Sequence, residues 1–246
     1  MKVSVLTPSY NSGKYIERAI QSVLKQDYKN WEHIIVDGQS KDNTLNILNK
    51  YPHLKWISET DQGQSDAMNK AFSMSSGDII VYLNADDELK ENVFITVLKE
   101  FEDPQVDFVL GKLEKVNQWG ESKVITPSTD IFRILLYWPC AFPLNPVSYY
   151  YRRHVQQNIG DFPIDNHLTM DYWFLLRAYH RYHIHKVDKI LGLFYTTVSN
   201  KSSDAQKAKQ SLKQTRNQFL IEQKNFRYFL FLTKHKLFKA LSSIVI

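Results

Sequence analysis

Residues 79–87 read Ile79-Ile80-Val81-Tyr82-Leu83-Asn84-Ala85-Asp86-Asp87, an apolar run that leads directly into two carboxylates. β-Branched and aromatic residues in series indicate a strand buried on both faces, as in a parallel sheet. Open α/β sheets bind ligands at the carboxyl ends of such strands, where Asp86 and Asp87 lie. Their hard oxygen ligands suit Mg²⁺ or Mn²⁺ bridging phosphates. Two acids after a strand are also common in solvated turns, so this stretch alone leaves both interpretations open.

The rest of the first hundred residues repeats this strand–helix pattern. Apolar and β-branched runs predict strands at residues 2–6, 31–36, 54–58 and 79–83. Helical spacing of apolar residues predicts helices at 15–26, from 45, from 67 and at 93–101. Strands that alternate with helices four times imply a parallel sheet with right-handed crossovers, and therefore an α/β fold.

Each predicted strand ends in a polar cluster, at residues 7–11, 37–42, 61–66 and 84–87. In a parallel sheet these ends share one edge, so the clusters should converge on one crevice. Any single cluster is also a plausible capped turn, but four together favour a ligand with several phosphate and hydroxyl groups. No G-x-G-x-x-G or P-loop follows the first strand, which argues against a dinucleotide or P-loop site.

Composition adds constraints on partners and compartment. A single cysteine, Cys140, excludes an internal disulfide and is compatible with a reducing compartment. The opening residues do not resemble a signal peptide, and no apolar run is long enough to span a bilayer. The net charge of +5 comes from the tail, because residues 201–246 hold ten Lys or Arg and two acids. The body is slightly acidic, which argues against nucleic acid as a partner.

The motifs at the strand ends resemble those of family 2 glycosyltransferases of GT-A fold. The resemblance lies in Val5–Asn11, Ile35–Thr44, Asp61–Lys70 and Leu83–Asp87, in the order and spacing of the family and over roughly residues 1–200. It implies a Rossmann-like, mostly parallel sheet flanked by helices, and an inverting transferase that uses a nucleotide-sugar.

The resemblance also implies a division of the chain. Residues 1–203 would form the GT-A domain, with a nucleotide-sugar-binding half at 1–103 and an acceptor-binding half at 104–203. Residues 204–246 would form a C-terminal helical extension with a basic and aromatic tail. Aromatic residues crowd into 143–153; their faces suit sugar rings or lipid, although core packing is the alternative for any single tyrosine there.

Five positions match donor-binding positions of the family. Thr7, Tyr10 and Asp37 match positions that hold the nucleotide base and ribose. A carboxylate such as Asp37 suits ribose hydroxyls or a uracil N–H as a charge-assisted acceptor. Asp61 and Asp66 match positions that line the donor sugar and diphosphate, although Asp66 could instead cap a helix.

The metal motif of the family is altered in this sequence. Asp86 matches the second acid of the D-x-D motif, whereas Asn84 replaces the first. Asparagine can hydrogen-bond ribose or a metal-bound water, and it contributes no charge. The family often supplies a late histidine to the metal, but residues 193–202 contain none. The expected cofactor is Mn²⁺ or Mg²⁺ on Asp86, with the histidine ligand in doubt.

Residues 168–177 match the acidic motif at the head of a helix, whose aspartate is the catalytic base of inverting members. Asp171 occupies that position and would lie in the first turn, where the helix dipole favours a carboxylate. A helix-capping role is the alternative, and Asp165 is the reserve candidate for the base. His180, His183 and His185 lie close together, but alternation over residues 182–187 predicts a strand surface and not a metal site.

The tail predicts two helices, at residues 205–223 and 225–246. In the second, Phe226, Phe229 and Leu230 share one face, which Leu237, Leu241 and Ile244 extend. Basic residues and no acids accompany them, a pattern typical of helices at an anionic membrane surface. Docking on the chain's own domain or on a partner subunit is the alternative.

We therefore expect a metal-dependent inverting glycosyltransferase that uses a nucleotide-sugar, most simply UDP-linked. Its acceptor would be a lipid-linked or polysaccharide glycan of the cell surface. The expected location is the cytoplasm, with peripheral attachment at the inner face of the plasma membrane. The alternative, favoured by Asn84 and the missing late histidine, is a non-catalytic protein of the same fold that binds nucleotide-sugar or acts as a scaffold.

Overall fold

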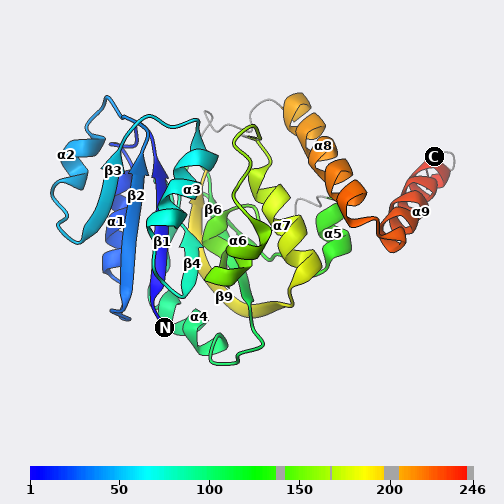
Figure 1. The fold of residues 1–246 in the computed structure, drawn as a ribbon, viewed down its shortest axis with the longest axis horizontal. Coiled ribbons are helices and arrows are strands. Elements are labelled where there is room, and N and C mark those ends of the chain that lie inside the picture. The colour runs from blue at the N-terminus through cyan, green and yellow to red at the C-terminus, as the bar shows by residue number, and fades with distance from the viewer. Residues whose placement is uncertain (137–141, 167, 197–204, 243–246) are drawn as a thin grey trace.

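The computed structural model describes residues 1–136, 142–166, 168–196 and 205–242, with 205 and 236–242 as backbone only. Within these residues nine strands form one sheet in the order β3-β2-β1-β4-β8-β6-β9-β5, with β7 paired to β6 (Figure 1). The strands are β1 (Val3–Ser9), β2 (Trp31–Asp37), β3 (Leu54–Ser58), β4 (Ile79–Tyr82), β5 (Glu88–Leu89), β6 (Phe108–Val116), β7 (Ser122–Ile125), β8 (Tyr149–Arg152) and β9 (Ile184–Tyr195).

The first half of the chain forms the parallel part of the sheet, as predicted. β1 pairs in parallel with β2 on one side and with β4 on the other, and β3 adds to β2 in parallel. The strands of this half are short apolar runs, buried on both faces in β1 and β4. Because side chains alternate along β4, Ile80 and Tyr82 enter one core cluster and Ile79 and Val81 enter another.

Helices cover the two faces of this sheet, and each follows a strand. One face packs against α3 (Gln64–Met74), and the other packs against α1 (Ile16–Leu24), α2 (Thr44–Leu48) and α4 (Val93–Glu100). In α1 the buried residues recur at helical spacing, which is why the sequence predicts this helix. The strand–helix alternation therefore brings the carboxyl ends of β1 to β4 to one edge.

The second half extends the sheet with strands of both directions. β8 pairs antiparallel with β4 and β6, β9 runs parallel to β6, and β5 and β7 pair antiparallel with β9 and β6. A hairpin joins β6 to β7, and Gly120 has a φ of 83° in its turn. Tyr149, Tyr150 and Tyr151 form β8 and are at most 1% exposed. These three aromatic rings therefore pack in the core and are not available to a sugar or lipid.

The helices of the second half cover the new part of the sheet. They are α5 (Ile131–Leu135), the short 3₁₀ helix η1 (Pro146–Ser148), α6 (Arg153–Ile159), α7 (Met170–Arg181), α8 (Ala205–Gln223) and α9 (Phe226–Ser242). α5 ends at Leu135 and Leu136 caps it, and residues 137–141 lie outside the described residues. The predicted strand surface at 182–187 begins β9, which starts at Ile184.

The tail helices leave the body at the end of the sheet opposite to β3 (Figure 1). α8 packs on α7: Phe219 is fully buried, and Glu222 pairs with Arg177. At the start of α9, Tyr228 is buried and its hydroxyl contacts His180 Nδ1 at 2.8 Å. Thus α8 and one side of α9 dock on the chain's own domain.

In the part of the chain that the structure describes, none of the helices combines the length and apolarity needed to cross a membrane.

Candidate active site

A cavity of about 940 Å³ opens at the carboxyl edge of the parallel strands, where the polar clusters were expected to meet. Its walls come from the loops after β1, β2, β3 and β4, from the start of α7 and from the end of β9. Five of the predicted site residues line it, namely Tyr10, Asp61, Asn84, Asp86 and Asp171. The fold therefore places the proposed donor and acceptor residues around one space.

The other three predicted residues lie beside the cavity and do not line it. Thr7 is fully buried, and its hydroxyl contacts His33 Nε2 at 2.9 Å. Asp37 is also fully buried, and its Oδ2 accepts from the Ser40 backbone N–H at 2.9 Å and from the Ser58 hydroxyl at 2.8 Å.

Asp66, the third of these residues, is in the first turn of α3. It accepts a 3.0 Å hydrogen bond from the Gln62 backbone N–H and forms an ion pair with Lys70. Asp37 and Asp66 thus stabilise the loops that shape the cavity, and Thr7 links the strands β1 and β2 beside it.

One end of the cavity presents an aromatic ring and a carboxylate. Tyr10 is 65% exposed, so its ring is free to stack on a planar base. Asp61 accepts a 2.8 Å hydrogen bond from the Gly63 backbone N–H, which orients its carboxylate. Gly38 lies against Asp61, and a Cβ at that position would be 2.5 Å from Asp61 Oδ2. A side chain at position 38 would therefore displace the Asp61 carboxylate.

The loop after β4 holds the acidic pair. Asp86 lines the cavity, and burial raises its pKa above the usual range. Asp87 is fully buried and points away from the cavity wall, where its carboxylate accepts hydrogen bonds from the amides of Asn84 and Asn145 and from the backbone N–H of Tyr195. Burial and the neighbouring Asp86 charge raise the pKa of Asp87, while these three hydrogen bonds oppose the rise.

Asn84 therefore has a structural partner in this loop. Its amide donates to Asp87 at 3.0 Å, and its Oδ1 accepts a 3.1 Å hydrogen bond from Gln64 in α3. The side chain that replaces the first acid of the motif thus joins the β4 loop to the start of α3.

The donor set suits a divalent cation held largely by its substrate. Among the described residues no three His, Cys, Asp or Glu side chains come together as a preformed metal site. Asp86 supplies one carboxylate to the cavity. Among the described residues, no side chain donates a hydrogen bond to this carboxylate. Mg²⁺ in phosphate-transfer sites is typically bound by one or two carboxylates plus substrate phosphates, so Asp86 fits this mode.

Asp171 reaches the same cavity from the first turn of α7. Its Oδ1 atom is buried, and no described residue donates a hydrogen bond to it. Burial raises the pKa of this carboxyl to about 6. An unpartnered carboxylate with such a pKa is suited to accept a proton near neutral pH.

The reserve residue and the histidines lie elsewhere. Asp165 is exposed and does not line the cavity. His185 pairs with Glu100 at 2.8 Å, and His180 contacts Tyr228, so both have protein partners.

Sequence reasoning missed three residues that complete the wall next to Asp86. Arg18, Asn145 and Tyr195 line the cavity, from α1, from the residue before η1 and from the end of β9. None belongs to a strand-end motif of the first half. The signal that could have found Asn145 and Tyr195 is Asp87, because a buried acid beside a ligand site needs donors from other segments. Arg18 contacts the Asp86 carbonyl and Glu88 instead, and no signal in the sequence indicated it.

Comparison with known proteins identifies the family. The model of glycosyl transferase family 2 matches residues 4–186. An uncharacterized glycosyltransferase of Nostoc sp. is 31% identical over 179 residues, which cover 67% of this chain and 54% of that protein. The UDP-Glc:alpha-D-GlcNAc-diphosphoundecaprenol beta-1,3-glucosyltransferase WfgD of Escherichia coli is 33% identical over 138 residues, which cover 54% of each protein. The chain spans about half the length of these two relatives.

Solved structures agree on the fold. Staphylococcus aureus TarS 1-349 in complex with UDP-GlcNAc matches with a TM-score of 0.67 and 26% identity, over 87% of this chain and 65% of that one. The mixed sheet flanked by helices is the GT-A fold of such structures. Since the family model covers residues 4–186, the chain belongs to glycosyl transferase family 2.

Proposed function

We propose that this protein is an inverting glycosyltransferase that takes a sugar from a UDP-linked donor. The observation that carries the proposal is the shared cavity, which brings Asp86 and Asp171 together from the two halves of the chain. The TarS complexes with UDP and with UDP-GlcNAc support the choice of donor, because they share this fold at 25% and 26% identity.

The donor would lie along the strand ends of the first half. Tyr10 offers its exposed ring to the base, and Asp61 would face the sugar or diphosphate from the loop after β3. Thr7, Asp37 and Asp66 would act by holding the loops that contact the base and ribose. The diphosphate would lie beside Asp86, where a bound Mn²⁺ or Mg²⁺ would offset the charge that develops on the leaving group.

Asp171 would act on the acceptor. As the acceptor oxygen attacks the anomeric carbon, the bond to the diphosphate oxygen breaks and the electron pair leaves with the diphosphate. The Asp171 carboxylate takes the hydroxyl proton in the same step. One displacement inverts the anomeric configuration.

The acceptor would be a lipid-linked or polysaccharide glycan. WfgD supports this choice, because its name describes transfer to a sugar on diphosphoundecaprenol. The tail supports a position at an anionic membrane surface on the cytoplasmic side. Phe226, Phe229 and Leu230 are 75%, 46% and 43% exposed on α9, whereas Tyr228 faces the body.

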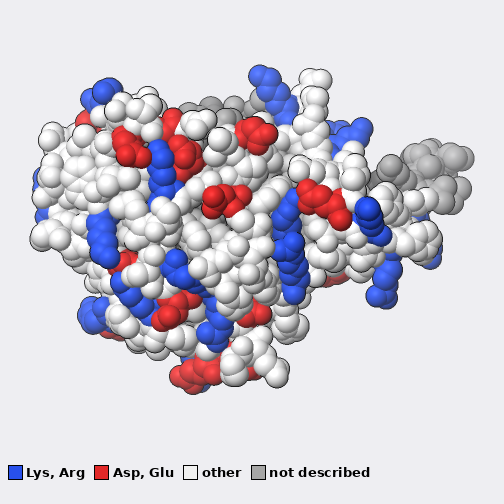
Figure 2. All heavy atoms as spheres, viewed as in Figure 1, with Lys and Arg blue, Asp and Glu red and all other residues white. Residues whose placement is uncertain are grey.

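Charge in the tail favours the same surface. Lys224, Arg227 and Lys234 are exposed, and no acid follows Glu222 in the sequence. Over the face of the molecule shown in Figure 2, by contrast, acidic and basic groups are interspersed on the body. An apolar face flanked by basic residues is the arrangement that binds anionic lipid. Leu237 and Leu241, which are predicted to share this face, lie where only the backbone is described, and Ile244 lies outside the described residues.

The test is transfer by the purified protein from a panel of UDP- and GDP-sugars to undecaprenyl-diphosphate-linked acceptors. We expect a UDP-sugar to be used and the product to have the inverted anomeric configuration by NMR. Asp171→Asn should still bind UDP and lose transfer by roughly 10²–10⁴-fold. A protein that binds UDP but releases no UDP from any UDP-sugar, with or without Mn²⁺, would instead be a non-catalytic binding protein.

A further inference from the structure

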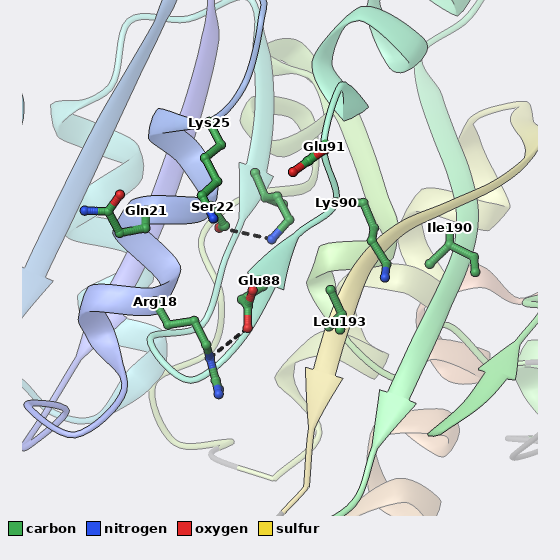
Figure 3. Close-up of a pocket in the computed structure, with 10 residues that line it drawn as sticks. Arg18, Gln21, Ser22, Lys25, Glu88, Lys90, Glu91, Ile190 and Leu193 are labelled. Atoms are coloured by element: carbon green, nitrogen blue, oxygen red, sulfur yellow. Dashed lines mark hydrogen bonds and ion pairs between the residues drawn. The ribbon is translucent and has the colours of Figure 1, made fainter. Parts of the chain in front are cut away.

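Arg18 belongs to none of the strand-end motifs, yet it stands between two cavities. It lines the active-site cavity, and it also lines a second cavity of about 610 Å³ between α1, β5 and β9. Figure 3 shows the second cavity, with Arg18 and Lys25 reaching from α1 and Glu88 facing Arg18 from β5. Arg18 thus forms the shared wall, next to the loop that carries Asp86.

Three contacts fix the Arg18 guanidinium in this wall. Its Nε is 2.9 Å from Glu88 Oε1, and its Nη2 donates a 2.6 Å hydrogen bond to the backbone carbonyl of Asp86. Its Cζ atom lies 3.7 Å from the ring centroid of Tyr195, whose hydroxyl donates to Glu88 at 2.7 Å. Glu88 and the Asp86 carbonyl contact the nitrogen atoms of the guanidinium, and the Tyr195 ring covers its face. These contacts hold it in one orientation before any ligand binds.

One nitrogen of this guanidinium remains free for a ligand. No residue in the described part of the chain forms a hydrogen bond with Nη1, and the side chain is 37% exposed. The described lining of the active-site cavity contains one other basic residue, Lys41, which lies in the loop after β2. Arg18 is therefore the cation that the cavity presents beside Asp86.

We propose that Arg18 binds the diphosphate of the nucleotide donor beside Asp86, supplying positive charge that acts together with a metal ion and also without one. The proposal rests on the proposed function, because it assumes a nucleotide diphosphate donor. A planar guanidinium with a free N–H group matches phosphate oxygens in geometry and in charge. Asn84 lowers the negative charge of the metal motif, so the motif attracts a divalent cation less strongly. A fixed cation therefore has more of the diphosphate charge to offset.

The geometry has a second consequence for metal binding. A positive charge against the Asp86 backbone disfavours a divalent cation nearby, since like charges repel. Because the Arg18 guanidinium would supply positive charge to the diphosphate in the absence of a metal, UDP should bind with measurable affinity in EDTA. Removal of the Arg18 charge should make UDP binding depend more strongly on Mn²⁺.

The experiment is calorimetry of UDP, uridine and inorganic pyrophosphate, each in EDTA and in Mn²⁺, on the full chain. Arg18→Gln should weaken UDP in EDTA by about tenfold or more, and weaken pyrophosphate likewise, because a charge-assisted hydrogen bond is lost. Uridine affinity should stay within twofold. The control is Lys25→Gln, which removes an exposed cation of the same helix that lines only the second cavity.

Arg18→Gln removes the ion-pair partner of Glu88 and leaves it the Tyr195 hydroxyl, so stability needs a control of its own. The double variant Arg18→Gln/Glu88→Gln removes both charges and should show the same loss of UDP affinity with a restored melting temperature. UDP affinity within twofold of wild type in both variants would overturn the proposal. Equal losses of uridine and UDP would assign Arg18 a purely structural role and overturn it as well. Wild-type protein that binds no UDP, GDP or pyrophosphate would instead refute the proposed function itself.

Discussion

The side-chain amide of Asn145 donates a 2.7 Å hydrogen bond to Oδ2 of Asp87, and this bond joins the two halves of the chain beneath the cavity. Asn145 is 2% exposed and Asp87 is fully buried. The backbone N–H of Tyr195 donates to the other oxygen of the same carboxylate at 3.0 Å. The loop that presents Asp86 is therefore fixed by residues more than fifty positions further along the sequence.

Asn145→Ala should destabilise the protein and weaken donor binding together. It leaves a buried carboxylate with one donor fewer, which typically costs about 1–3 kcal/mol. Chemical denaturation would measure the change in unfolding free energy, and UDP titration the change in affinity. Asn158→Ala is the matched control, because Asn158 is exposed and donates only to the Tyr182 hydroxyl on the surface. Equal stability of the two variants would show that the bond to Asp87 contributes nothing.

Asp86→Asn should abolish the gain in UDP affinity that Mn²⁺ produces, because the cavity loses its hard anionic ligand. The UDP affinity measured in EDTA should persist, since Arg18 and the nucleotide loops are unchanged. Calorimetry with and without Mn²⁺ measures both quantities. Asp188→Asn serves as control, because this exposed acid on β9 pairs with Lys112 outside the cavity. A variant at Asp86 that keeps the full Mn²⁺ effect would place the metal elsewhere.

The pH dependence of transfer should report Asp171. The proposed base must be ionised to accept a proton, and burial raises its pKa to about 6. The value of kcat/KM for transfer should therefore fall as the pH decreases through about 6. A profile that stays flat from pH 8 to pH 5 would exclude Asp171 as the base.

Asp171→Asn should also change stability with a defined sign. Folding raises the pKa of this carboxyl. Its contribution to the stability of the folded state is therefore fully present at pH values below its pKa in the unfolded chain, and is lost as the pH rises through its pKa in the folded protein. The asparagine variant should thus equal or exceed wild type in unfolding free energy above pH 7 and lose this advantage near pH 4. Urea melts at the two pH values measure the difference. Greater stability of wild type at pH 8 would contradict the unpaired burial of the carboxylate.

The exposed side of α9 should hold the protein on anionic vesicles. Phe226→Ser with Phe229→Ser removes the two exposed rings and should reduce sedimentation with phosphatidylglycerol vesicles at low and high salt, because apolar burial is insensitive to salt. Substitution of Lys224 and Arg227 by glutamine should reduce binding mainly at low salt. Val124→Ser, at an exposed apolar residue of β7, is the control. If the full-length protein does not sediment with such vesicles, the exposed side of α9 binds a protein partner instead.

Most of the helices and strands could be predicted from local patterns of apolar and polar residues. The helix predicted at 205–223 and the strand predicted at 54–58 match α8 and β3. β8 was not predicted, because three consecutive tyrosines carry no alternation of polar and apolar residues. In the structure Tyr149 and Tyr151 enter one core cluster and Tyr150 the other, so both faces of this strand are apolar.

The site was predictable as far as topology decides it. Parallel strands bring their carboxyl ends to one edge, which is why Asp61 and Asp86 share a cavity. Asp171 reaches the same cavity from the first turn of α7. Whether a side chain points into that cavity depends on its hydrogen-bond partners, and some of these come from other segments. Asp37, for example, accepts hydrogen bonds from Ser40 in its own loop and from Ser58 on β3, and no local pattern indicates the second.

The start of α7 has a consequence for the construction of hybrid enzymes. The Thr169 hydroxyl contacts those of Ser211 and Thr215 on α8 at 2.9 and 2.8 Å, two residues before Asp171. Phe219 of the same helix is fully buried in the core that supports α7. An exchange of acceptor halves between relatives should therefore place its crossover after Gln223, so that each Asp171 equivalent travels with the helix that braces it.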